Sequence, residues 1–459
     1  MKSIATVFAL TTMIALLSNC TSQVNDDSPK SNPAESRQLI SQLENKIANK
    51  LFKDAFNELL ARSPEQQSYL GIKDNYHQWD DISDDNARET QQIIQRQWRQ
   101  IQKNLDYARL DEETKLSYRL FEYNTRISQQ AFQYRFHSYP VDQMNGMQSE
   151  VPAFLINIHP SQSEEDMLAY IGRLAGIKPL FEQLIVNLKE RAEKGVIIPL
   201  FVFPRVISDS QNIISGGPFS DSNEESTLLA DFRQKVEGLE LSRERKAELI
   251  SEAQATLLDS VKPAYENLID YLLELQRDAT VDDGVWKFPD GESFYIQALQ
   301  HTTTTQLTPA EVHRIGLDEV VRIHREMGTI LKRLEFDGDL QEFFHFLRSD
   351  PQFYFNNTPK GKQAYLSMAV EIIARMQERL DELFLRRPNA DLIVKAVEPF
   401  REKSAGKAFY NRPAADGSRP GIFYVNLYDT RDMPAYELEA LAHHEGIQVT
   451  TCRYRSQPN

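Results

Sequence analysis

The sequence predicts a mainly α-helical protein with one short β hairpin near its C-terminal end. Apolar residues recur at steps of three and four, as in Ile40, Leu43 and Ile47, which is the spacing of one buried helix face. The segments 407–412 and 421–427 are instead rich in aromatic and β-branched residues, and the loop between them contains an Asp-Gly pair. With 459 residues, the chain is long enough to bury a large core as one domain or two lobes.

The expected elements follow one another along the chain. Helical periodicity extends from residue 39 to about residue 120, and further helical patterns cover 85–105, 111–136, 163–194, 228–277, 292–301, 340–348 and 361–386. Another helix has a clear start, because Thr308 can cap it, Pro309 suits its first position, and Glu311 stands three residues after the cap. Residues 208–226 are rich in Gly, Ser, Asn and Asp, which predicts a surface loop.

Composition and charge restrict the class of protein. The chain is 41% hydrophobic and 26% charged, which is ordinary for a soluble globular protein. Its formal net charge is −15, and its sequence pI is about 5.2. Because nucleic-acid binding needs a basic surface, we expect no nucleic-acid partner.

The N-terminus resembles an export signal. Met1 and Lys2 precede an apolar run, residues 4–17, that is too short to span a membrane. Leu17-Ser18-Asn19-Cys20 resembles a lipoprotein cleavage box, which would make Cys20 the lipidated N-terminus of the mature protein; an ordinary secretory signal with an incidental cysteine is the alternative. The residue after Cys20 is not Asp, which favours an anchor at the periplasmic face of the outer membrane. We therefore predict a signal peptide over 1–20 and a flexible tether over 21–37.

A His-Glu pair near the end of the chain indicates the chemistry. Residues 432–441 begin like a helix, and His444 and Glu445 follow on it. In zinc hydrolases with such a pair, the His binds the metal and the Glu acts as the general base on a metal-bound water. The second His of that signature is missing, because Gln448 stands four residues after His444.

The sequence around this pair resembles a known family. The segments 416–427 and 434–441, together with His444-Glu445, are similar to the bacterial domain-of-unknown-function 885 family, whose members resemble helical zinc metallopeptidases. The resemblance implies a large helical, zincin-like metallopeptidase architecture, with the β hairpin beside the active-site helix. In that family the motif continues as Pro-Gly-His-His, whereas this chain departs from it at Gln448.

A shift of reading frame explains the departure. If one C is restored before the codons for residues 448–457, the new register can encode Pro-Gly-His-His-Met-Gln-Ile, which is the family continuation. We therefore predict an incomplete metallopeptidase-like domain over 38–447, with its C-terminal part missing, and an aberrant tail over 448–459. Because Cys452 lies in that tail and Cys20 carries the lipid, no disulfide is expected. A natural divergent terminus is the alternative.

The resemblance assigns roles to four residues. It implies zinc binding by His444, general base and acid catalysis by Glu445, and a peptide-like substrate held beside Tyr424 and Asn426. The segment 422–427 would be an edge strand that pairs with an extended peptide. Because the second His and a third ligand, a downstream Glu, are absent, we expect this chain to hold zinc weakly or not at all and to lack hydrolase activity.

Two other functions are alternatives to the zinc hydrolase. A noncatalytic lipoprotein that binds a ligand or partner through a helical cleft is the main alternative to the exported hydrolase of peptide or related amide bonds. A serine or cysteine hydrolase is disfavoured, because the sequence contains no Gly-x-Ser-x-Gly elbow and no suitable cysteine.

Overall fold

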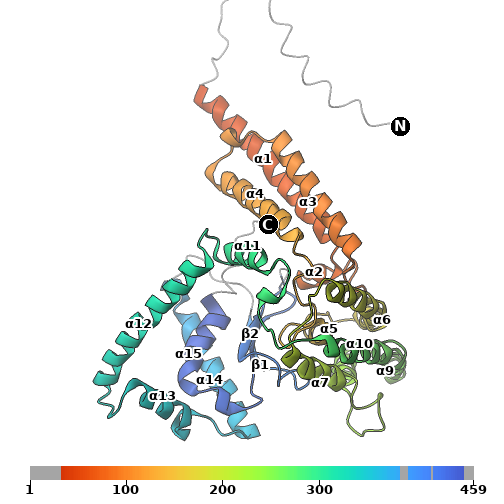
Figure 1. Cartoon of the computed structure of the whole chain (residues 1–459). Helices are drawn as coiled ribbons and strands as arrows, with labels where there is room; N and C mark the ends of the chain where they lie inside the picture. Colours follow the sequence, from red (N-terminus) through yellow and green to blue (C-terminus); the bar gives the residue numbers. More distant parts are fainter. Residues whose placement is uncertain (1–32, 383–390, 415–416, 449–459) are drawn as a thin grey trace, which may run out of the picture.

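The structure, a computed structural model, describes residues 33–382, 391–414 and 417–448 and confirms the mainly helical fold. The chain starts with α1 (Pro33–Leu60), α2 (Pro64–Tyr69), α3 (Asp84–Asn104) and α4 (Glu112–Phe132). Helices α1, α3 and α4 lie side by side as an elongated bundle (Figure 1, red to orange). Ser63, Ser83 and Asp111 cap α2, α3 and α4, because each side chain accepts a backbone N–H three residues on. Residues 33–37, expected within the tether, are helical.

The largest hydrophobic core lies among the next six helices. These are α5 (Met147–Asn157), α6 (Glu164–Glu193), α7 (Phe203–Ile213), α8 (Thr227–Glu237), α9 (Arg243–Thr256) and α10 (Lys262–Leu275). Phe181 and Tyr265 fill the centre of this core, with ring centroids 4.8 Å apart. Each buried side chain of this size contributes about 1.5–3 kcal/mol through the hydrophobic effect, so this block is the rigid support of the fold.

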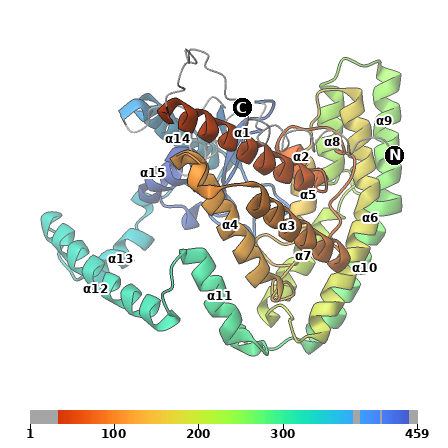
Figure 2. The same ribbon diagram turned by 90° about the horizontal axis from the view of Figure 1, so that it is seen from above.

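Four helices follow along the outer side of the molecule: α11 (Gly291–Thr303), α12 (Pro309–Arg333), α13 (Leu340–Ser349) and α14 (Pro359–Glu378). The predicted start of α12 is confirmed, because the Thr308 hydroxyl accepts the Glu311 N–H and the Glu311 carboxylate accepts the Thr308 N–H. Figures 1 and 2 show α12 standing apart from the helical core. Of the residues of α12, all of which the structure describes, Leu331 alone is buried.

A three-stranded sheet separates α14 and α15 (Ala435–His443) from the helical core (Figure 1). Its strands are β1 (Leu392–Ala396), β2 (Ala408–Asn411) and β3 (Gly421–Val425), in the order β1-β3-β2. Strands β2 and β3 form the predicted antiparallel pair, and β1 runs parallel to β3. Phe423 and Val425 pack with α14 and α15, whereas Ile422 and Tyr424 face the other side. Both faces of β3 are covered, one by α14 and α15 and the other by side chains of β1, β2 and the β1–β2 connection.

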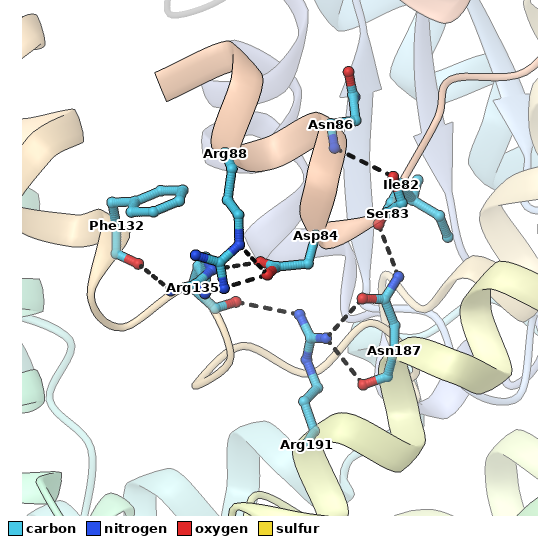
Figure 3. Close-up of polar contacts among 9 residues, drawn as sticks. All are labelled: Ile82, Ser83, Asp84, Asn86, Arg88, Phe132, Arg135, Asn187 and Arg191. Atoms are coloured by element: carbon cyan, nitrogen blue, oxygen red, sulfur yellow. Dashed lines mark hydrogen bonds and ion pairs between the residues drawn. The ribbon is translucent and has the colours of Figure 1, made fainter. Parts of the chain in front are cut away.

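A polar cluster ties the α3–α4 end of the bundle to α6 (Figure 3). The Asp84 carboxylate, at the start of α3, accepts a hydrogen bond of 2.5 Å from Arg135 Nε. The Arg135 carbonyl accepts one of 3.2 Å from Arg191 of α6. Asn187, one turn before Arg191, donates its amide to the Ile82 carbonyl at 2.8 Å. The last two bonds satisfy the backbone carbonyls of Arg135 and Ile82. Together the three contacts fix this end of the bundle on the helical core.

The structure corrects three expectations from the sequence. First, 422–427 is not an edge strand, because β1 pairs with the side of β3 that the hairpin leaves open. Second, the helical pattern over 228–277 is divided into α8 and α9–α10, with a π-helical turn at Leu257–Val261. Third, residues 208–213 of the expected loop belong to α7. Strand β1 and helix α5 were not predicted from the sequence, because both are short and lack a clear period.

Candidate functional site

The predicted His-Glu pair lies where α15 ends. Pro434 precedes the first turn of α15, and Leu438 and Ala442 are fully buried in the core shared with α14. The helix continues as a π-helical segment, His444–Gln448. Buried residues at steps of four fix one face of α15 on the sheet and α14, so the residues that follow are presented at a defined position.

The two side chains of the pair differ in exposure. The His444 side chain is 66% exposed, whereas that of Glu445 is 20% exposed, and His444 Nε2 lies 4.0 Å from Glu445 Oε1. Burial raises the pKa of the Glu445 carboxyl above its usual range, and the neighbouring His444 opposes this shift in pKa. A half-buried carboxyl with a raised pKa is suited to take up and release a proton closer to neutral pH.

The surroundings of the pair test whether a zinc ion would fit. Catalytic zinc sites use three protein ligands, and structural sites use four. Among residues 33–382, 391–414 and 417–448, no three His, Cys, Asp or Glu side chains lie close enough together to hold a metal ion. The donors that the structure describes therefore do not fit a zinc site.

Tyr424 lies inside the molecule rather than on its surface. Its side chain is fully buried on β3, and its ring stacks on Phe409 of β2 with centroids 4.8 Å apart. Burial raises the pKa of its hydroxyl, and the carboxylate of Glu398 adds to this rise in pKa. The role of Tyr424 in substrate binding stays a prediction. Because its side chain is fully buried, its position is better suited to supporting the wall of a site than to contacting a ligand.

Asn426 holds the connection between β1 and β2. Its side-chain amide donates to the carbonyls of Glu402 at 2.7 Å and Ala405 at 3.0 Å, and its oxygen accepts the Tyr428 N–H at 3.0 Å. It also lines a cavity of about 510 Å³, together with Tyr428 and Tyr436. Its predicted contact with substrate stays a prediction, since its amide is already engaged in shaping this loop.

A charged network that the sequence reading missed lies on the other side of the sheet. The Arg401 side chain is 6% exposed, and its guanidinium contacts Glu398 at 2.8 Å and Glu150 of α5 at 2.9 Å. Asn157, also on α5, donates its amide to Glu398 at 2.6 Å. The segments 150–157 and 398–401 are far apart in the sequence, so no local motif could have revealed the network.

A second cavity, of about 240 Å³, lies beside this network between α5 and β2. Aromatic side chains form much of its lining: Tyr69, Phe154, Phe409 and Tyr410. Glu150 and Arg401 are the charged residues of the lining. The cavity therefore combines apolar walls with a small number of polar groups, which is typical of ligand sites.

Fold and site together define a mainly helical protein whose small mixed sheet supports a helix ending in a His-Glu pair. The profile of the family described as "Bacterial protein of unknown function (DUF885)" matches residues 64–447. The chain belongs to this family. The matched region ends at Ile447, and Gln448 is the residue at which the sequence is expected to depart from the family motif. No curated protein matches the chain.

Two solved structures share the fold. A "putative lipoprotein" from Colwellia psychrerythraea is 24% identical, with a TM-score of 0.79, and the match covers 88% of this chain and 71% of that one. A "putative lipoprotein of unknown function" from Shewanella oneidensis is 16% identical, with a TM-score of 0.54, and the match covers 87% of this chain and 70% of that one. Cys20 lies outside the described residues, and none of the described helices has the length and apolar composition needed to cross a bilayer.

Proposed function

We propose that this family scaffold is an exported, peptidase-like hydrolase. In an intact member, residues at the positions of His444 and Glu445 would bind zinc and act as the general base, whereas the donors described in this chain do not complete such a site. The observation that carries the proposal is the pair itself: an exposed imidazole stands beside a partly buried carboxyl at the end of a helix fixed on a sheet. The substrate would be a peptide or a related amide.

We propose that this chain itself lacks hydrolase activity. Its described residues contain no group of three His, Cys, Asp or Glu side chains that could hold zinc, so zinc affinity should be weak. The predicted frameshift after Ile447 accounts for the missing ligands. Sequencing the gene across codon 447 tests this part of the proposal, and a register without Pro-Gly-His-His codons would refute it.

The hydrolase proposal is tested by comparing this chain with the frame-restored protein. Both are purified, their zinc content is measured by atomic emission, and cleavage of a fluorogenic peptide library is followed. The restored protein should carry about one zinc and cleave peptides, and its Glu445→Gln variant should keep the zinc and lose activity. If the restored protein binds zinc but hydrolyses no amide bond, the hydrolase proposal is wrong.

The same proposal places the protein at the outer membrane, anchored through Cys20. Two neighbours in fold, each described as a "putative lipoprotein", support this placement. Metabolic labelling with palmitate and membrane fractionation provide the test, with Cys20→Ser as the control. Label that persists in the Cys20→Ser variant would contradict the anchor.

A noncatalytic binding function is the second candidate. It is favoured by the cavity between α5 and β2, which has aromatic walls and lies on the opposite side of the sheet from α15. In that case the restored protein would bind peptides without cleaving them.

A further inference from the structure

Strand β2 is an edge strand of the sheet. Among the strands that the structure describes, the order β1-β3-β2 gives β2 one neighbour, β3. The backbone N–H of Asn426 donates to the Lys407 carbonyl at 2.9 Å, which makes these two residues a hydrogen-bonded pair of the antiparallel ladder. The next pair, Ala408 and Val425, is therefore a non-hydrogen-bonded pair of the ladder. Val425 directs its carbonyl toward β1, where it accepts the Val397 N–H at 3.0 Å.

The same alternation sets the direction of the Ala408 backbone. Because Ala408 belongs to the pair that is not hydrogen-bonded, its N–H and C=O point away from β3. All four residues of β2 line the cavity of about 240 Å³. An extended chain lying along this edge could therefore bond to the Ala408 backbone and place a side chain in the cavity.

The size and walls of the cavity suit a single long side chain. Its volume is below the range of about 300–1,000 Å³ typical of pockets for drug-sized molecules. Tyr69 and Phe154, whose ring centroids are 5.4 Å apart, line it together with Phe409. Aromatic faces attract both alkyl stems and cations.

Charge at the cavity favours a cationic head group. The Arg401 guanidinium is 6% exposed and is engaged by both Glu150 and Glu398, whereas the Glu150 side chain is 44% exposed. A carboxylate has room for about four hydrogen bonds. One oxygen of Glu150 contacts Arg401, so the carboxylate retains capacity for a second cation. Burial within the cavity wall raises the pKa of Glu150, and a bound cation would counteract that rise in pKa.

We propose that the cavity between α5 and β2 is a subsite for a Lys or Arg side chain of an extended peptide. The peptide pairs with the Ala408 backbone at the outer edge of β2, its alkyl stem lies among Tyr69, Phe154 and Phe409, and its cationic head meets Glu150. This inference deepens the proposed function by naming a substrate class, and it relocates the peptide-pairing edge from β3 to β2.

Binding of short peptides tests the subsite without requiring hydrolysis. The chain is treated with a chelator and titrated with fluorescein-labelled Ala-Ala-Lys-Ala-Ala and with the matching peptides that carry Leu or Glu at the centre. The Lys peptide should bind at least tenfold more tightly than the Glu peptide. Methylation of the backbone nitrogens next to the central residue should abolish binding, because it removes the groups that pair with β2.

Variants of the chain locate the binding. Glu150→Gln should lower the affinity for the Lys peptide to that for the Leu peptide, whereas Glu402→Gln, which removes the same charge from the other cavity, should leave it unchanged. Unfolding midpoints establish that both variants are folded. Equal affinity for all three peptides, or tighter binding of the Glu peptide, would overturn the subsite. Absence of cleavage by the frame-restored protein would instead refute the hydrolase and leave this result intact.

Discussion

The guanidinium of Arg401 lies 2.9 Å from the carboxylate of Glu150, although 251 residues separate them in the sequence. The contact joins the β1–β2 connection to α5 and thus links the sheet to the helical core. Arg401 is at the same time 2.8 Å from Glu398, and its guanidinium lies 5.0 Å from the centroid of the Phe409 ring. A single buried cation therefore holds one wall of the candidate peptide subsite in place.

Replacing Arg401 should destabilise the protein strongly. Arg401→Met leaves the carboxylate of Glu398, whose side chain is 11% exposed, without its main partner. Removing one member of a buried ion pair costs about 3–5 kcal/mol. The free energy of unfolding in urea measures the effect, with Glu150→Gln as the milder comparison because its side chain is 44% exposed. A loss below about 1 kcal/mol for Arg401→Met would show that the network carries little stability.

Stability should fall between weakly acidic and neutral pH because of Glu65. Burial, assisted by the nearby Asp80, raises the pKa of Glu65 to about 7 from an ordinary value of 4.5. The folded state therefore keeps the proton over a range in which the unfolded state has released it. The resulting loss of stability is absent below pH 4.5, grows as the pH rises to about 7, and is constant above that.

Glu65→Gln should remove this pH dependence. The amide oxygen of Gln can still accept the Asp80 N–H that Glu65 accepts at 3.2 Å. At pH 8 the variant should be more stable than the parent chain by up to about 3 kcal/mol, given 1.36 kcal/mol per unit of pKa. Urea unfolding at pH 5 and pH 8 measures both effects. The exposed Glu244→Gln serves as the control, and an unchanged pH profile in Glu65→Gln would refute the assignment.

The apolar stripe of α12 should promote aggregation. Val320, Ile323 and Ile330 are 48%, 40% and 51% exposed on one face of a helix that buries little. Changing these three residues to Gln should reduce light scattering on heating and alter stability by only a few tenths of a kcal/mol each. Leu331→Ala, at the buried residue of the same helix, should cost about 2 kcal/mol or more. Unaltered aggregation in the triple variant would show that another surface is responsible.

Asn426→Asp should separate a structural role from a role in substrate binding. The substitution keeps an oxygen that can accept the Tyr428 N–H but places a carboxylate against the carbonyls of Glu402 and Ala405. Loss of these two bonds should lower the free energy of unfolding by about 1–3 kcal/mol. Peptide affinity at the α5–β2 cavity should change less than twofold, as measured by the same titrations. Unchanged stability with weakened peptide binding would favour the substrate-binding role.

Local patterns in the sequence were sufficient for much of the fold. Apolar residues at helical spacing predicted α3, α4 and α6 within a few residues, and Thr308 and Glu311 predicted the start of α12. The antiparallel pairing of β2 with β3 also followed from local signals, because a loop with an Asp-Gly pair joins them. The position of β1 did not, since a parallel partner is chosen by contacts distant in sequence.

The features of the candidate site also divide into those predicted by local sequence and those set by tertiary structure. The sequence by itself determined the helical class, the hairpin, the His444-Glu445 pair and the membership of the family, because these depend on residues close together in the chain. Tertiary structure alone decided that β3 is central and β2 is an edge, that Tyr424 is buried, and that Arg401 meets Glu150. Packing brings such residues together through the burial of apolar faces, which constrains which segments meet but leaves no local mark in the sequence.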